Sequence, residues 1–184
     1  MSTFTYLKSF VTDKHVASVT PSSRFCVKRV CNSLDFINTR KIIEYGPGTG
    51  VFTKYLLKHL PSEAEIVTME TNKNFVDQLN ALQDSRLTVF QDGVENIDKH
   101  IKESWYGATD MILSGIPFSF LEESDKEHIL ETSYRLLRNG GQFLAYQTSG
   151  HLKEALQHHF DELDTEMEWK NLPPMMIYRA RKSS

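Results

Sequence analysis

The sequence predicts a doubly wound α/β domain, in which helices cover both faces of a mostly parallel sheet. Three observations carry this prediction. Short apolar runs alternate with amphipathic segments through most of the 184 residues. A glycine-rich turn at 46–50 joins the first apolar run to the next helical segment. The length fits one domain with a single substantial core. We therefore expect about seven strands, with an antiparallel C-terminal strand, plus N-terminal helices.

The first forty residues carry no strand pattern. Apolar residues at positions 4, 7, 10 and 11 recur at helical spacing. Pro21-Ser22-Ser23 is a helix-capping turn, and apolar residues at 25, 27, 30 and 34 predict a second helix after it. We expect residues 1–40 to form a helical extension or lid near the carboxyl edge of the sheet, and residues 41–184 to form the main domain.

The remaining elements follow from apolar runs and helix-ending residues. The expected strands are 41–46, 65–70, 87–92, 110–114 and 142–147, and the expected helices are 51–60, 73–83, 122–138 and about 151–162. Pro61 ends the first of these helices, and Asn139-Gly140-Gly141 predicts the end of the third. Two final strands are expected near 166–169 and 175–179, on either side of a proline loop.

The composition is that of an ordinary globular protein, with 40% hydrophobic and 24% charged residues. No apolar run is long enough to cross a bilayer, and none resembles the core of a signal peptide. A cytoplasmic location is therefore expected. The spacing of Cys26 and Cys31 matches neither a disulfide framework nor a zinc site, so we expect reduced, partly buried thiols and no metal.

Charge is distributed unevenly along the chain. Residues 1–41 hold seven Lys or Arg against Asp13 and Asp35, a net charge of +5, and the remainder carries −8. A basic end on an acidic body favours an anionic partner, whereas a solvated basic helix without a partner would show the same pattern. The apolar stripe near the N-terminus is likewise compatible with core packing or with a membrane anchor.

The glycine turn excludes two common nucleotide sites. A dinucleotide-binding G-x-G-x-x-G turn would require glycine or alanine where Val51 stands, and a P-loop would require Gly-Lys-Ser/Thr after the turn. What remains is E-x-G-x-G-x-G, formed by Glu44, Gly46, Gly48 and Gly50. Glycines at alternate positions let the backbone and the following helix N-terminus approach a ligand closely.

Two further carboxylates end neighbouring strands. Glu70 ends the second strand, where it can accept both hydroxyls of a ribose, and Asp92 ends the third. Because the ends of parallel strands share one edge, Glu44, Glu70 and Asp92 are expected to converge on one crevice. An acidic crevice without a phosphate-binding residue suits a ribose-bearing ligand with a cationic centre and amine donors, such as S-adenosyl-L-methionine. A surface role for Glu70 and an Asp-Gly turn at Asp92 are the alternatives.

Over residues 41–150 the sequence resembles the class I S-adenosylmethionine-dependent methyltransferases, which have a Rossmann-like fold. The resemblance implies that the three glycines pass close to the methionine part of the cofactor and that Glu44 orients the loop and the ammonium side. It also implies that Glu70 binds the ribose hydroxyls and that Asp92 meets the adenine amine. By the same resemblance the cofactor site is expected to include Tyr45, Thr71, Gly93 and Ser114.

Within this superfamily the glycine turn is most similar to two branches, the ribosomal RNA adenine dimethyltransferases and the bacterial phospholipid N-methyltransferases. Adenine methyltransferases carry Asn-Leu-Pro-Tyr or a relative after the fourth strand, where the polar side chain holds the adenine amine. This chain has Ser114-Gly115-Ile116-Pro117, with glycine in place of the amide. The phospholipid branch shares this segment, Pro-Ser-Ser at 21–23 and Asn-Leu-Pro-Pro at 171–174. The resemblance implies that the substrate is bound by Ser23, Gly115, Ile116 and Pro117.

The sequence therefore predicts a methyltransferase that N-methylates a phospholipid headgroup amine such as that of phosphatidylethanolamine. Reversible contact with an anionic membrane, on its inner face, is expected, and stable nucleic-acid binding is not. Methylation of a nucleic-acid base or small soluble amine, and a non-catalytic cofactor-binding role, are the alternatives. The amine must lose a proton before attack, and the sequence does not choose among the candidate acceptors, which are Tyr6, His15, Tyr45, His151, Ser114 and the backbone carbonyls of 114–117.

Overall fold

A computed structural model describes residues 24–31, 34–148, 150, 152–171 and 173–183. Its strands are β1 (Lys41–Tyr45), β2 (Glu65–Met69), β3 (Leu87–Phe90), β4 (Thr109–Ser114), β5 (Leu137–Gln147), β6 (Glu162–Glu168) and β7 (Met175–Arg181). Its α-helices are α2 (Arg24–Cys31), α3 (Val51–His59), α4 (Lys73–Asn80), α5 (Glu123–Leu136) and α6 (Leu152–His159). Three short 3₁₀ helices complete it, namely η1 (Val94–Lys99), η2 (Glu103–Trp105) and η3 (Phe118–Phe120).

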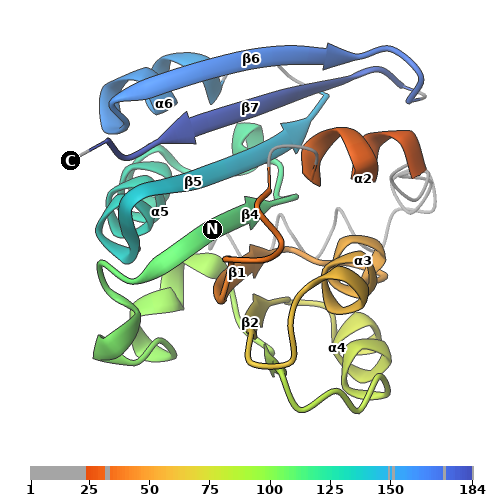
Figure 1. The fold of residues 1–184 in the computed structure, drawn as a ribbon. Coiled ribbons are helices and arrows are strands. Elements are labelled where there is room, and N and C mark those ends of the chain that lie inside the picture. Colours follow the sequence, from red (N-terminus) through yellow and green to blue (C-terminus); the bar gives the residue numbers. More distant parts are fainter. Residues whose placement is uncertain (1–23, 32–33, 149, 151, 172, 184) are drawn as a thin grey trace.

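The described strands form one seven-stranded sheet in the order β3-β2-β1-β4-β5-β7-β6 (Figure 1). β1 pairs in parallel with both β2 and β4, and β5 pairs in parallel with β4. β7 runs antiparallel to both of its neighbours, β5 and β6. The predicted doubly wound sheet with an antiparallel C-terminal strand is confirmed. The strand order reverses between β1 and β4, which is where open α/β sheets bind ligands.

A hydrophobic core lies on each face of the sheet, because neighbouring residues of a strand point to opposite faces. On one face, Ile42 of β1 packs in a cluster with Phe52 and Leu56 of α3. On the other face, Ile43 belongs to a cluster that includes Ile129 of α5. All five side chains are almost completely buried. These two layers hold the carboxyl ends of β1, β2 and β4 in fixed positions.

Helix α2 confirms the second predicted N-terminal helix. Its Val27 and Val30 are buried in the same cluster as α3, and the Cys26 thiol lies 3.9 Å from the sulfur of Met175. Arg29 forms an ion pair with Glu166 of β6. Cys31 is also buried, and neither thiol of this described helix forms a disulfide. The first predicted helix lies outside the described residues.

Several boundaries differ from the prediction by two residues or more, and the differences at α5 and β6 have a clear cause. Helix α5 ends at Leu136 rather than at Asn139-Gly140-Gly141, because Leu137 is already extended, fully buried and paired with Thr109. Gly140 instead adopts a left-handed conformation, with φ +75°, within β5, where the pairing of β5 with β4 shifts register between Leu137 and Gln142. β6 begins at Glu162, well before the predicted position 166, because its exposed side chains are polar and hide the strand pattern.

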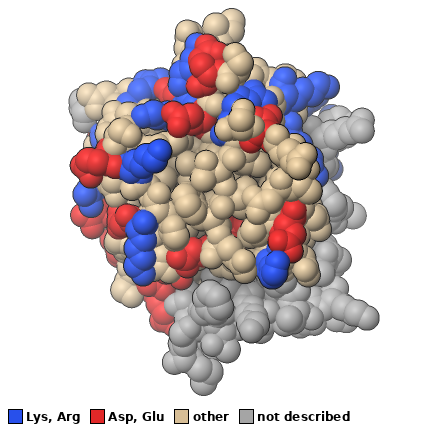
Figure 2. Space-filling view, turned by 90° about the horizontal axis from the view of Figure 1, so that it is seen from below, with Lys and Arg blue, Asp and Glu red and all other residues tan. Residues whose placement is uncertain are grey.

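Basic and acidic side chains surround a central area of other residues on the side of the molecule seen from below (Figure 2). Both signs of charge lie next to each other there, so this view of the described residues shows no continuous basic surface. Across the described ranges, no helix combines the length and the apolar character needed to cross a bilayer.

Candidate active site

The glycine loop after β1 is held by backbone conformations that glycine alone adopts readily. Gly46, Gly48 and Gly50 have φ of +66°, +54° and +73°. A Cβ at Gly46 would lie 2.8 Å from Cγ2 of Ile116, so the missing side chain lets the loop touch the segment after β4. Gly50 is the N-cap residue of α3. The loop therefore passes directly from the buried strand β1 into the helix.

Glu70 directly follows β2, and its carboxylate joins the end of that strand to the glycine loop. Its Oε2 accepts a hydrogen bond from the Gly48 N–H at 3.0 Å, and its Oε1 accepts one from the Asn72 N–H at 2.8 Å. Burial raises the pKa of Glu70 above its usual value, and the bonds from these two backbone groups partly offset that rise. The carboxylate is thus fixed at the strand end, where the resemblance implied a ribose site.

Glu44 lies beneath the loop, on β1, and is 1% exposed. Its Oε2 accepts a hydrogen bond from the Thr53 hydroxyl at 2.7 Å, whereas its Oε1 is buried without a partner among the described residues. Burial raises the pKa of Glu44 to about 7, against the effect of the Thr53 bond, and the charge of Glu70 adds to the rise. Glu44 therefore holds its proton to a higher pH than an exposed glutamate does.

Asp92 follows β3 and is held by three neighbours. Its Oδ1 accepts hydrogen bonds from the Gly93 N–H and the Asn96 side chain, and its Oδ2 lies 2.7 Å from Nε2 of His100. Burial would raise the pKa of Asp92, but His100, Gly93 and Asn96 together lower it below the usual value. Asp92 therefore both begins an Asp-Gly turn and lines the pocket.

The segment after β4 is packed tightly against the glycine loop and β5. The Gly115 N–H donates to the Tyr45 carbonyl at 2.9 Å, and a Cβ at Gly115 would overlap the hydroxyl of Tyr146. Ser114 is buried, and its hydroxyl has no partner among the described residues. Position 115 therefore has no room for the amide side chain that adenine methyltransferases carry in this segment.

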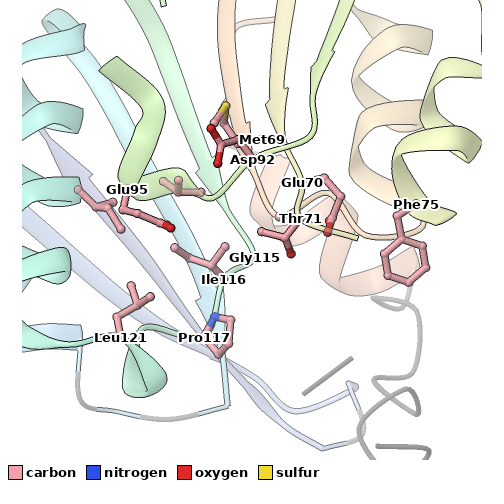
Figure 3. Close-up of a pocket in the computed structure, with 13 residues that line it drawn as sticks. Met69, Glu70, Thr71, Phe75, Asp92, Glu95, Gly115, Ile116, Pro117 and Leu121 are labelled. Atoms are coloured by element: carbon pink, nitrogen blue, oxygen red, sulfur yellow. The ribbon is translucent and has the colours of Figure 1, made fainter. Parts of the chain in front are cut away.

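These segments enclose one pocket at the carboxyl edge of the sheet. Figure 3 shows Glu70 and Thr71 on one side of it, Glu95 on the other, and Gly115 and Ile116 between them. The predicted site residues that line it are Gly46, Glu70, Thr71, Asp92, Gly115, Ile116 and Pro117. The lining residues that were not predicted are Met69, Phe75, Val94, Glu95, Leu121 and Ile129.

Other predicted site residues lie beside the pocket rather than in its lining, namely Glu44, Tyr45, Gly48, Gly50, Gly93 and Ser114. The Tyr45 hydroxyl points into the core, where it lies 3.1 Å from Oγ of Ser133. Its side chain is fully buried and is absent from the pocket lining, and burial raises its pKa above the usual value. Four predicted residues lie outside the described part of the chain, namely Tyr6, His15, Ser23 and His151.

The pocket is acidic and otherwise mainly apolar. Glu70, Asp92 and Glu95 line it, and no Lys, Arg or His is among its described lining residues. Such a pocket suits a cationic ligand better than a phosphate. A strand-end carboxylate, an open glycine backbone and apolar walls together fit S-adenosylmethionine, which has a ribose, an adenine and a sulfonium centre. The described residues form no group of three or more His, Cys, Asp or Glu that could hold a metal ion.

Comparisons with known proteins agree with this geometry. Residues 43–143 match the methyltransferase domain family. An ornithine lipid N-methyltransferase of Singulisphaera acidiphila is 23% identical over 169 residues, which are 90% of this chain and 88% of that protein. The structure of the N-methyltransferase NodS from Bradyrhizobium japonicum WM9, in complex with S-adenosyl-L-homocysteine, superposes with a TM-score of 0.71 at 12% identity over 100% of both chains.

A second similar structure is an S-adenosylmethionine-dependent O-methyltransferase from Thermotoga maritima. Its TM-score is 0.64 at 14% identity, and the match covers 86% of this chain but 65% of that one. At these identities the solved structures establish the fold. The family match covers more than half of the chain, and the chain therefore belongs to the methyltransferase domain family. Its cofactor is S-adenosylmethionine, and the protein is a class I methyltransferase.

Proposed function

We propose that this methyltransferase transfers methyl groups to the amine of a lipid headgroup. The observation that carries the proposal is the likeness to an ornithine lipid N-methyltransferase over 90% of the chain. Ornithine lipid and phosphatidylethanolamine both present an amine at the end of a membrane-bound molecule. The proposal therefore names a class of acceptor, which is an amine on a lipid headgroup. Ornithine lipid and phosphatidylethanolamine are the two candidates within this class.

The chemistry of the pocket supports an amine acceptor. Carboxylates from three segments line it together with apolar side chains, and Gly115 leaves no polar side chain to hold a nucleic-acid base. An amine that enters as an ammonium ion would meet opposite charge in a partly dry site, where the attraction is stronger than in water. This favours N-methylation of an amine over methylation of a base.

We assign the cofactor-binding roles by the same reasoning. Gly46, Gly48 and Gly50 would present backbone to the methionine part of the cofactor, with Glu44 supporting the loop from below. Glu70 would accept the ribose hydroxyls, and the adenine amine would meet Asp92. When bound, the cofactor supplies an electrophilic methyl group on sulfur. The chain's task is to hold the amine in line with that methyl group, about 3 Å away, and to exclude water.

The N-terminal residues 1–40 are proposed as the extension that brings the enzyme to its lipid. Residues 1–41 carry a net charge of +5 whereas the whole chain carries −3, and each Lys or Arg near an anionic bilayer contributes about 1 kcal/mol to binding. Charge combined with an apolar helix face gives reversible attachment. The proposed location is thus cytoplasmic, with contact at the inner face of the membrane and no stable binding to nucleic acid.

The test is to incubate the full chain with methyl-labelled S-adenosylmethionine and separate acceptors. The panel holds vesicles of ornithine lipid, of phosphatidylethanolamine and of phosphatidylcholine alone, together with RNA and small soluble amines. Label is expected in the two amine-bearing lipids and not in phosphatidylcholine, whose nitrogen carries no proton. Label in RNA, or in soluble amines with none in lipid, would contradict the proposal.

A further inference from the structure

We propose that Glu95 binds the acceptor amine and receives the proton that this amine loses. The inference rests on the proposed amine acceptor and deepens it by naming the residue that selects for an amine. Glu95 lies in the first turn of η1, immediately after the Asp92-Gly93 turn, and it lines the pocket. Its position was not predicted as part of the site.

Glu95 is the pocket carboxylate that has no partner among the described residues. Glu70 accepts backbone hydrogen bonds on both of its oxygens. Asp92 is also engaged on both oxygens, by Gly93 and Asn96 on one and by His100 on the other. No hydrogen bond or ion pair joins Glu95 to another described residue. Of the three, it is the carboxylate left available to accept N–H groups from a bound amine.

The backbone places this carboxylate over Gly93. A Cβ at Gly93 would overlap the carboxylate oxygens of Glu95. Gly93 itself is extended, with φ −75° and ψ 152°, a conformation that any residue adopts. A methyl group at position 93 would therefore displace the Glu95 carboxylate, which is the end of a flexible side chain, without straining the backbone. Figure 3 shows Glu95 projecting into the pocket toward Ile116, on the side opposite Glu70 and Thr71.

The surroundings of Glu95 favour a cationic partner. The neighbouring lining residues Val94, Ile116, Leu121 and Ile129 are apolar, and no described basic side chain lines the pocket to neutralise the carboxylate. A charge-assisted hydrogen bond in such a site is shorter and stronger than one between neutral groups. The segment 115–117, proposed for the acceptor, lies beside it.

The transfer step balances with this assignment. One N–H bond of the ammonium ion breaks, its proton passes to the Glu95 carboxylate, and the electron pair stays on nitrogen. That pair forms the new N–C bond to the methyl group as the C–S bond breaks and its electrons return to sulfur. Glu95 then releases the proton to water. A neutral thioether remains, and the methylated nitrogen carries the positive charge that the sulfur has lost.

The experiment compares the Glu95→Gln variant with a matched control, Glu103→Gln. Glu95 is the acidic residue in the first turn of η1, and Glu103 is the acidic residue in the first turn of η2. Glu103, however, is exposed and does not line the pocket. We expect kcat/KM for the amine-bearing lipid to fall by roughly 10- to 100-fold in Glu95→Gln, the size expected for losing a hydrogen bond to a charged group. S-adenosylmethionine affinity, measured by calorimetry, should change less than about twofold in both variants.

A second variant, Gly93→Ala, keeps the carboxylate but displaces it. It should remain folded, because its backbone conformation suits alanine, and its lipid methylation should fall as the Glu95 carboxylate is displaced. Unchanged kcat and KM in Glu95→Gln, with wild-type enzyme active on the lipid, would overturn the role of Glu95 and leave the lipid proposal standing. A matching loss of cofactor affinity would also overturn it.

The two proposals fail separately. If the wild-type chain methylates a soluble amine and no lipid, the lipid proposal is wrong, and Glu95→Gln is then assayed on that amine with the same expectation. If the wild-type chain methylates RNA, or no acceptor on the panel, both proposals are wrong.

Discussion

At the scale of single residues, Glu44 links the stability of the protein to pH. Burial raises its pKa to about 7 from an ordinary value of 4.5, so the folded protein holds this proton more tightly than the unfolded chain. Stability contributed by the protonated form is complete below pH 4.5 and is lost as the pH rises to about 7. The full loss is on the order of 3 kcal/mol.

We predict that Glu44→Gln is more stable than the wild type above neutral pH and that the advantage disappears in acid. Glutamine is neutral and retains an oxygen that can accept the hydrogen bond from Thr53. The measurement is the free energy of unfolding in urea for both proteins, between about pH 4.5 and pH 8. An advantage that stays constant across this range would contradict the assigned role of ionisation.

Glu70 is expected to dominate cofactor affinity. Glu70→Gln should weaken S-adenosylmethionine binding by roughly 10- to 100-fold, because it removes the charge that the ribose hydroxyls would meet. The same change also weakens the hydrogen bond that the Gly48 N–H donates to residue 70. This hydrogen bond helps to order the glycine loop. Calorimetry measures the effect, and Glu65→Gln, on the exposed first residue of the same strand, is the control. Equal affinity in both variants would argue against a ribose site at Glu70.

At the scale of elements, the glycine loop gives a paired prediction. Gly46 and Gly48 both have positive φ, but a Cβ at Gly46 meets Ile116, whereas one at Gly48 meets nothing within 4 Å. Gly48→Ala should therefore cost only backbone strain, about 1–2 kcal/mol of stability. Gly46→Ala should cost more and should also lose more cofactor affinity, because it pushes apart two walls of the pocket. Thermal unfolding and calorimetry of both variants test this, and equal losses would contradict it.

Most elements could be predicted because they bury apolar residues in simple patterns. The strand at 41–45 and the helix at 51–59 lie within one residue of their predicted ends. The misses have physical causes. Leu137 continues the apolar pattern of α5, but its side chain packs as the start of β5, a tertiary contact that local spacing does not reveal. The polar edge strand β6 is defined by pairing with β7 and not by its own hydrophobicity.

The polar and glycine residues of the candidate site could be predicted from the sequence, but the apolar residues that line the pocket could not. Glu70, Asp92 and Gly46 were found because motif spacing and strand ends place them at one edge, and the structure brings them to one pocket. The apolar walls, such as Phe75 on α4 and Ile129 on α5, read as core positions in the sequence. Glu95 was missed although it stands three residues after Asp92, because only the folded turn shows that it faces the pocket.

At the scale of the whole molecule, cofactor binding should stabilise the fold. A ligand that binds only the folded state at about 100 times its dissociation constant adds about 2.7 kcal/mol of stability. For a chain of this length that corresponds to a rise in Tm of about 5–10 °C. S-adenosylmethionine and S-adenosylhomocysteine should both produce the rise in the wild type, and adenosine triphosphate should not, because the pocket lining offers it no described basic residue. Comparable shifts with adenosine triphosphate would contradict the acidic character assigned to the site.

The central claim is that one pocket at the carboxyl edge of the sheet holds the methyl donor next to the acceptor. A crystal structure of the full chain with S-adenosylhomocysteine tests this most directly. It is predicted to show the ribose hydroxyls hydrogen-bonded to Glu70, the amino-acid part along the glycine loop, and the sulfur turned toward Gly115 and Glu95. A nucleoside bound elsewhere on the molecule, or a ribose that makes no contact with Glu70, would contradict the account.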